Sequence, residues 1–237
     1  MDTFLKQYKE IVKPIFAPLG FKFKGQNCLR VTNDVVQSFC LSRSRWGRAC
    51  RVTFDVLPLC APIDSPMVRQ GIGIYDLSNL PSGKDWWEYA PDSPADVEGC
   101  IRDMVGFMER NLLPFFQKTE SCQEAYPVLC KLLNDNGILV LDDDCWQEDA
   151  CYIALKRGEK LDVVLDFLRS GVEVWAKRLN AEDSTPESDQ LIQSFLTTER
   201  SCIAAIESGD KNRLQEEILK REARSASLLK DFIIKNV

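Results

Sequence analysis

Residues 50–56 alternate between apolar and polar side chains, and this alternation constrains the fold more than any other feature of the chain. One set is Cys50, Val52, Phe54 and Val56, and the other is Arg51, Thr53 and Asp55. A period of two is typical of a β-strand with one buried and one solvent-facing side. Similar segments occupy residues 21–24, 28–31 and 35–42, with turns near residues 33–34 and 45–47. Because the connections are short, we expect an antiparallel sheet of four or five strands with one wet face.

Helical patterns flank the predicted strands. Residues 2–18 carry apolar side chains every three or four positions, and residues 94–117 do the same after a Ser93-Pro94 start. Ser as N-cap and Pro at the first helical position are strong start signals. We therefore expect these two helices to cover one face of the sheet, in an α+β domain of residues 1–118.

The remaining residues, 119–237, have a helical period throughout. Breaks at Asn136-Gly137 and at Ser208-Gly209-Asp210 interrupt the pattern. The predicted helices cover residues 120–134, 144–156, 159–179, 187–207 and 210–235. The expected fold is thus α+β, with an antiparallel sheet of four or five strands and two covering helices, followed by a helical C-terminal domain.

The chain has ten cysteines and no histidine. Catalysis by Ser-His-Asp or Cys-His groups and histidine-containing metal sites are therefore excluded. The cysteines lack the Cys-x-x-Cys spacing of zinc sites, and most lie in apolar surroundings. We interpret them as reduced, structural thiols. No motif indicates a cofactor.

The formal net charge is −6, which argues mildly against non-specific binding to nucleic acid or to anionic membranes. No apolar run approaches the roughly 20 residues that cross a bilayer. The N-terminal residues lack the basic and apolar regions of a signal peptide. We therefore expect a cytoplasmic protein without a membrane partner; its oligomeric state is left open.

Basic side chains and one indole gather at the turn near residues 45–47. The set is Arg43, Arg45, Trp46, Arg48 and Arg51. Arginines around an aromatic ring could bind an acidic protein surface, phosphate or RNA. Alternatively, the turn is a solvated hairpin tip whose arginines pair with carboxylates elsewhere in the chain.

A second candidate is the aromatic segment Trp86, Trp87 and Tyr89. Tryptophan and tyrosine anchor many protein interfaces. The alternative is a lid that folds back over the sheet and closes its core.

Three consecutive carboxylates, Asp142, Asp143 and Asp144, form a third candidate. They could hold Mg²⁺ or Ca²⁺ in a metal-dependent enzyme. However, the spaced ligands and the glycine of an EF-hand loop are missing, and acidic residues before a helix also cap it and favour its dipole.

The residues of the first strands also carry a family resemblance. The segment from Leu19 to Gly25 reads LGFKFKG, and it is followed by Leu29-Arg30 and by the strand Val35-Val36-Gln37-Ser38-Phe39. This pattern resembles a bacterial family of unknown function, domain-of-unknown-function family 4304, over residues 5–118. Some members lie near toxin–immunity loci, so the resemblance implies an immunity or interaction role. It brings no catalytic residues.

Together these observations favour a non-catalytic protein-binding module, of an immunity type if the family resemblance holds. The surface would comprise the arginine-rich turn, the aromatic segment and the open sheet face. The alternatives are a metal-dependent enzyme that uses Asp142–Asp144 and a weak nucleic-acid binder that uses the Arg43–Arg51 hairpin.

Overall fold

The alternating segments of the sequence form strands that pair in chain order. The computed structural model describes residues 3–62, 72–73, 86–135, 145–179 and 185–230. The antiparallel sheet runs β1 (Lys22–Lys24), β2 (Asn27–Val31), β3 (Val35–Arg43), β4 (Ala49–Pro58) and β5 (Ile72–Gly73), and β6 (Trp87–Glu88) also pairs with β4. The predicted α+β class is confirmed.

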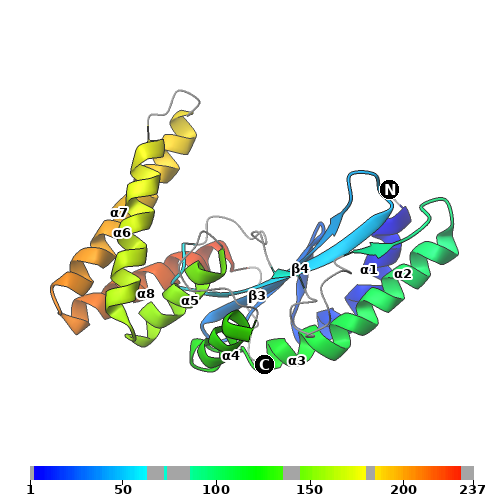
Figure 1. Cartoon of the computed structure of the whole chain (residues 1–237), viewed down its shortest axis with the longest axis horizontal. Helices are drawn as coiled ribbons and strands as arrows, with labels where there is room; N and C mark the ends of the chain where they lie inside the picture. The colour runs from blue at the N-terminus through cyan, green and yellow to red at the C-terminus, as the bar shows by residue number, and fades with distance from the viewer. Residues whose placement is uncertain (1–2, 63–71, 74–85, 136–144, 180–184, 231–237) are drawn as a thin grey trace.

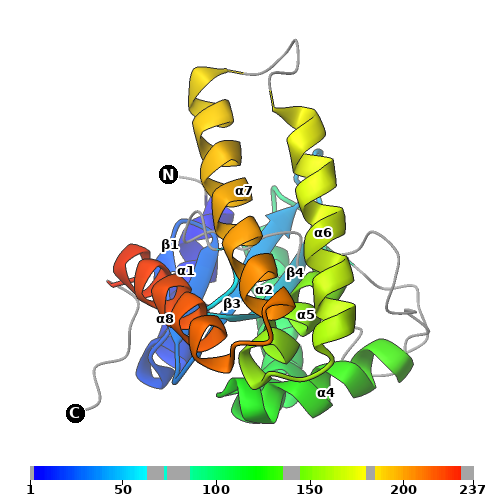
Figure 2. The same cartoon turned by 90° about the vertical axis from the view of Figure 1, so that its left-hand side faces the viewer.

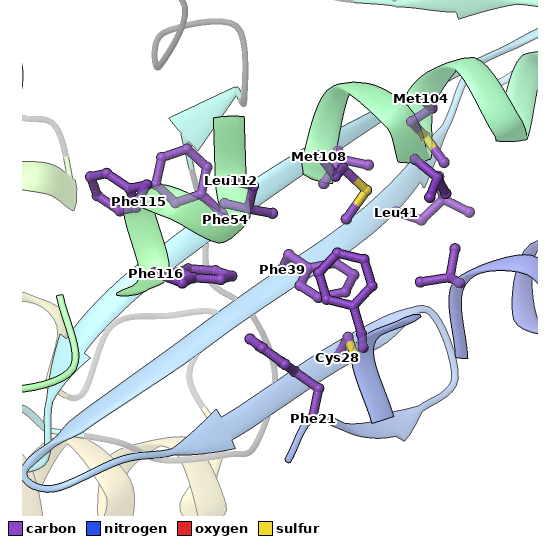
Figure 3. Packing of buried hydrophobic residues seen from close by; sticks show 14 of the residues in the cluster. Phe21, Cys28, Phe39, Leu41, Phe54, Met104, Met108, Leu112, Phe115 and Phe116 are labelled. Atoms are coloured by element: carbon purple, nitrogen blue, oxygen red, sulfur yellow. The ribbon is translucent and has the colours of Figure 1, made fainter. Parts of the chain in front are cut away.

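Two helical segments lie along one face of this sheet, as predicted. They are α1 (Thr3–Phe16), which continues into the short η1 (Ala17–Leu19), and α2 (Pro94–Phe107) (Figure 1). Gly20 ends the first segment at φ 88°, a left-handed conformation that glycine adopts without strain. The buried layer between helices and sheet is rich in aromatic rings. Phe39 packs against Phe16 and Phe21 at centroid distances of 4.7 and 5.5 Å (Figure 3).

The helix predicted over residues 94–117 is interrupted. After α2 the chain forms one π-helical turn, η3 (Met108–Leu112), and then α3 (Leu113–Gln117). Pro114 accounts for the change, because proline has no N–H to donate to the preceding turn and its ring crowds that turn's carbonyl. The side chain of Asn111 donates to the Phe107 carbonyl at 2.9 Å and so satisfies a carbonyl of the widened turn.

The C-terminal half is helical, as predicted. It comprises α4 (Cys122–Asp135), α5 (Cys145–Arg157), α6 (Leu161–Arg178), α7 (Pro186–Glu207) and α8 (Lys211–Leu228). Consecutive helices pack against one another. The pair α6 and α7 forms a long antiparallel hairpin that extends away from the sheet, at the end of the molecule opposite the β3–β4 turn (Figures 1 and 2).

A second apolar core corrects the expectation of one wet sheet face. Leu29, Val36 and Leu57 point to the face opposite α1 and α2, and they are buried with Tyr152 and Leu155 of α5. Residues of α6, α7 and α8 complete this core. Side chains of one strand alternate between the two faces of the sheet. When only part of the second face is covered, the strand sequences still alternate between apolar and polar residues, so the pattern does not reveal the second core. The wet face is therefore confined to part of the sheet.

The connection between α3 and α4, where the predicted domain boundary at residues 118 and 119 falls, is tied to the sheet. Asp34 accepts a hydrogen bond from the Cys122 backbone N–H at 2.8 Å, and Arg30 pairs with Glu120 at 3.1 Å. The division into two domains stays a prediction. Among the described helices, none combines the length and the apolar character that crossing a membrane requires.

Candidate functional site

The turn between β3 and β4 is held by its own backbone and by one serine. The Ser44 N–H donates to the Ala49 carbonyl at 2.8 Å, and the Gly47 N–H donates to the Ser44 carbonyl at 2.9 Å. The Ser44 hydroxyl accepts from the N–H groups of Arg48 and Ala49, both at 3.2 Å. Gly47 has φ +65°, as a hairpin loop built around a four-residue turn requires. The loop therefore presents its side chains from a defined backbone.

The side chains of this loop project into solvent. Trp46 is 80% exposed, and the guanidinium of Arg45 lies 5.8 Å from its ring centre. Arg48 and Arg51 are also exposed. Within the described ranges, no carboxylate lies at ion-pair distance from Arg45, Arg48 or Arg51. The alternative in which these arginines are neutralised by carboxylates finds no support among those residues.

The aromatic segment lies directly beside the hairpin. In β6, Trp87 is opposite Cys50 and Glu88 is opposite Ala49, so this segment extends the sheet along β4. The guanidinium of Arg51 lies 5.0 Å from the Trp86 ring, which is 36% exposed. Cation–π contacts of this kind hold the planar groups face to face. The two candidates that are separate in the sequence thus form one continuous surface.

The remaining three predicted residues support this surface from behind. Arg43 donates to the Tyr89 hydroxyl at 3.2 Å, and Tyr89 stacks on Phe4 at 4.7 Å. Trp87 is only 9% exposed, and its indole N–H donates to Asp103 at 3.2 Å. Trp87 and Tyr89 therefore belong to the core, as the lid alternative expects, and they anchor β6 against α1 and α2.

We call the exposed part of this arrangement the arginine–tryptophan surface. Its residues are Arg45, Trp46, Arg48, Arg51 and Trp86. It combines two exposed indoles with three cations on a strand pair and a tight turn. Such a surface can bury an aromatic anchor in a partner and place cations around it. It holds no nucleophile, base or acid arranged for catalysis.

The third candidate is not placed by the structure. Asp142, Asp143 and Asp144 lie outside the described residues. In the parts of the chain that the structure does describe, no group of three His, Cys, Asp or Glu residues is arranged to hold a metal ion. The hypothesis of a carboxylate metal site stays untested.

One polar cluster was not predicted. Arg221 of α8 and Glu199 of α7 form an ion pair that is 5% and 1% exposed, and the Tyr152 hydroxyl donates to the same carboxylate at 3.1 Å. Arg221 also lines a groove between α7, α8 and the residues after β4. Charged residues on amphipathic helices are usually exposed to solvent. The sequence therefore gives no indication that this pair is buried.

Comparison with known proteins identifies no relative. No protein-family model matches the chain, and neither does any curated protein or solved structure.

Proposed function

We propose that this protein is a non-catalytic binding module of the bacterial cytoplasm that recognises an acidic protein surface. The arginine–tryptophan surface would make the contact. The observation that carries the proposal is Trp46, which is 80% exposed at a tightly hydrogen-bonded turn. An indole held out in water gains most of its burial energy only when a partner covers it.

The charges argue for an acidic partner. Arg45 lies against the Trp46 ring and Arg51 against the Trp86 ring, Arg48 is exposed in the same turn, and no described carboxylate neutralises the three. The chain as a whole carries a net charge of −6, so these three cations are opposite in sign to the chain's net charge. A partner with a carboxylate-rich patch would be steered toward this surface, and guanidinium groups bind carboxylates through two parallel hydrogen bonds.

The combination of tryptophan and arginine in this surface is typical of strong protein interfaces. Tryptophan and arginine are the residue types most enriched among positions that dominate binding energy. Trp46 would be the central anchor, and the arginines would form the rim. The resemblance to family 4304 adds an immunity-type role to this proposal, in which the acidic partner is a toxin.

The first test captures the partner directly. A photo-crosslinking amino acid replaces Trp46 in the full-length protein, and a matched protein carries it at Trp175. Trp175 is 37% exposed on the α6–α7 hairpin and faces Arg178 at 5.2 Å, so it offers the same indole–guanidinium pair at the opposite end of the molecule. We expect one acidic protein to be crosslinked at position 46 and not at position 175.

The second test measures affinity for the captured protein. Trp46→Ala should weaken binding by about 2 kcal/mol or more, roughly thirtyfold, as expected for a central anchor. Arg48→Ala should mainly slow association and reduce its salt dependence. Trp175→Ala should leave the affinity unchanged. An affinity that Trp46→Ala does not alter would refute the proposal.

Nucleic acid is the alternative ligand, because an aromatic ring among arginines can also stack on a base. A nuclease-sensitive crosslink at position 46, with affinity that falls steeply as salt rises, would favour it. A crosslinked protein that survives nuclease treatment supports the protein partner.

A further inference from the structure

Three sulfur atoms meet in the buried layer between β4 and α2. The Cys50 Sγ lies 3.8 Å from the Cys100 Sγ and 4.0 Å from the Met104 Sδ. All three side chains are buried. We call Cys50, Cys100 and Met104 the sulfur cluster.

The cluster is assembled by the tertiary fold. Cys50 begins the inward-facing set of β4, whereas Cys100 and Met104 lie four residues apart on α2 and so project from the same face of that helix. Figure 3 shows Met104 directed from α2 toward the sheet. The Trp87 carbonyl lies 3.9 Å from the Cys100 Sγ, which places β6 at the edge of the cluster.

We propose that the sulfur cluster is a binding site for one soft monovalent metal ion, Cu(I), held by two thiolates and one thioether. Metal–sulfur bonds in proteins are about 2.3 Å long, so three sulfurs around one ion in a plane lie about 4.0 Å apart. The two separations that involve the Cys50 Sγ are 3.8 Å to the Cys100 Sγ and 4.0 Å to the Met104 Sδ. A linear ion between two thiolates would need a separation of about 4.6 Å, twice the bond length.

The donor set selects among metals. Thiolate and thioether sulfurs are soft ligands that prefer Cu(I). Structural zinc takes four ligands, usually thiolates and imidazoles. The chain has no histidine, and no third Cys, Asp or Glu joins the two thiols in a metal-binding group within the described residues. A three-sulfur site therefore suits Cu(I) better than Zn²⁺.

Binding of Cu(I) by the sulfur cluster can be balanced in protons and in charge. Binding releases one proton from each thiol, so Cu⁺ and two thiols give a bis-thiolate complex of charge −1 and two protons. Arg43 lies opposite Cys50 in the strand register, so its positive charge stands on the neighbouring strand beside the cluster. Arg43 would thus balance the complex.

This inference is independent of the proposed protein-binding function. It is tested on the full-length, reduced protein without oxygen, by titration with Cu(I) held by a chromophoric competing chelator. We expect wild type to withdraw one Cu(I) per chain, with thiolate-to-copper absorption in the ultraviolet. The Cys50→Ala/Cys100→Ala double variant should lose this uptake.

The matched control removes two other buried thiols, in the Cys60→Ala/Cys202→Ala double variant, which should bind Cu(I) like wild type. Met104→Leu keeps the volume of the core and should weaken binding without abolishing it. Circular dichroism shows whether each variant is folded, and X-ray absorption of the wild-type complex should show three sulfur neighbours. Equal uptake by wild type and the Cys50→Ala/Cys100→Ala variant would overturn the proposal. So would copper-driven formation of a Cys50–Cys100 disulfide with no Cu(I) retained.

Discussion

The buried carboxylate of Glu199 accepts two hydrogen bonds from the buried guanidinium of Arg221, each 3.1 Å long. The Arg221 ion pair joins α7 to α8, and the Tyr152 hydroxyl adds α5 to the same carboxylate at 3.1 Å. Arg221 also donates to the Thr198 carbonyl at 3.1 Å. Three helices of the C-terminal half are therefore aligned by one buried polar network.

Removing one partner of this ion pair should be strongly destabilising. Arg221→Met leaves the Glu199 carboxylate buried without its cation, which costs about 3–5 kcal/mol. Urea denaturation followed by circular dichroism measures the change in the free energy of unfolding. The double variant Glu199→Leu/Arg221→Met should lose less than Arg221→Met alone, because neither charge is then stranded. A double variant that loses as much as the two single variants together would contradict this account.

Replacing Gln37 of β3 by an apolar residue should lower the free energy of unfolding, because its buried side-chain amide is fully hydrogen-bonded. Its amide nitrogen donates to the carbonyls of Phe116 and Thr119 at 2.6 and 2.8 Å, and its carbonyl oxygen accepts from the Arg30 Nε at 2.8 Å. Gln37→Leu would remove this partner from the Thr119 carbonyl and from the Arg30 Nε, at about 1–3 kcal/mol for each, whereas the Phe116 carbonyl keeps the Thr119 N–H at 3.2 Å. We expect a loss of several kcal/mol in urea denaturation. A loss below about 1 kcal/mol would show that water replaces the amide.

Replacing Trp46 should leave the free energy of unfolding nearly unchanged, whereas replacing Trp87 should lower it. Trp46→Ala removes an exposed ring and should change the free energy of unfolding by less than about 0.5 kcal/mol. Trp87→Ala empties a core position and removes the hydrogen bond to Asp103, so we expect a loss of about 3–5 kcal/mol. Thermal and urea denaturation of both variants check this. Equal losses would mean that the turn is packed and not free to bind.

Alkaline pH should destabilise the protein through its buried thiols. Burial raises the pKa of Cys202 from its ordinary value of 9.0 to about 11. The folded state holds this proton more tightly than the unfolded state, so the stabilising contribution is fully present below pH 9 and is lost as the pH rises toward 11. The loss is about 2–3 kcal/mol. Cys60, whose pKa burial raises to about 12, adds to the same trend.

The measurement is urea denaturation between pH 8 and 10.5 under reducing conditions. In Cys202→Ala the decline of the unfolding free energy with pH should be shallower than in wild type, whatever its absolute stability. Parallel declines would show that Cys202 ionises equally easily in both states.

Particular elements show how far the sequence allowed prediction. The alternation in residues 50–56 predicted β4 with near-correct bounds, and the start signal at Ser93-Pro94 predicted the first residue of α2, because both patterns depend on local geometry. The π-helical turn before Pro114 was not predicted, since the sequence shows that the helix must adjust but not how. For the candidate surface, the sequence proposed both the hairpin and the aromatic segment. Only the register of β6 on β4 shows that they adjoin, and only the tertiary packing shows that Trp87 and Tyr89 are buried.

By itself, the sequence determined the α+β class, the succession of helices after residue 119 and the absence of histidine chemistry. These follow from periodicity and composition, which act along the chain. Tertiary structure alone decided which polar residues are buried together, as Arg221 and Glu199 are, and which sulfurs meet, as those of Cys50 and Cys100 do. Those residues stand 22 and 50 positions apart. Their proximity depends on how strands and helices pack, which no local pattern of side chains records.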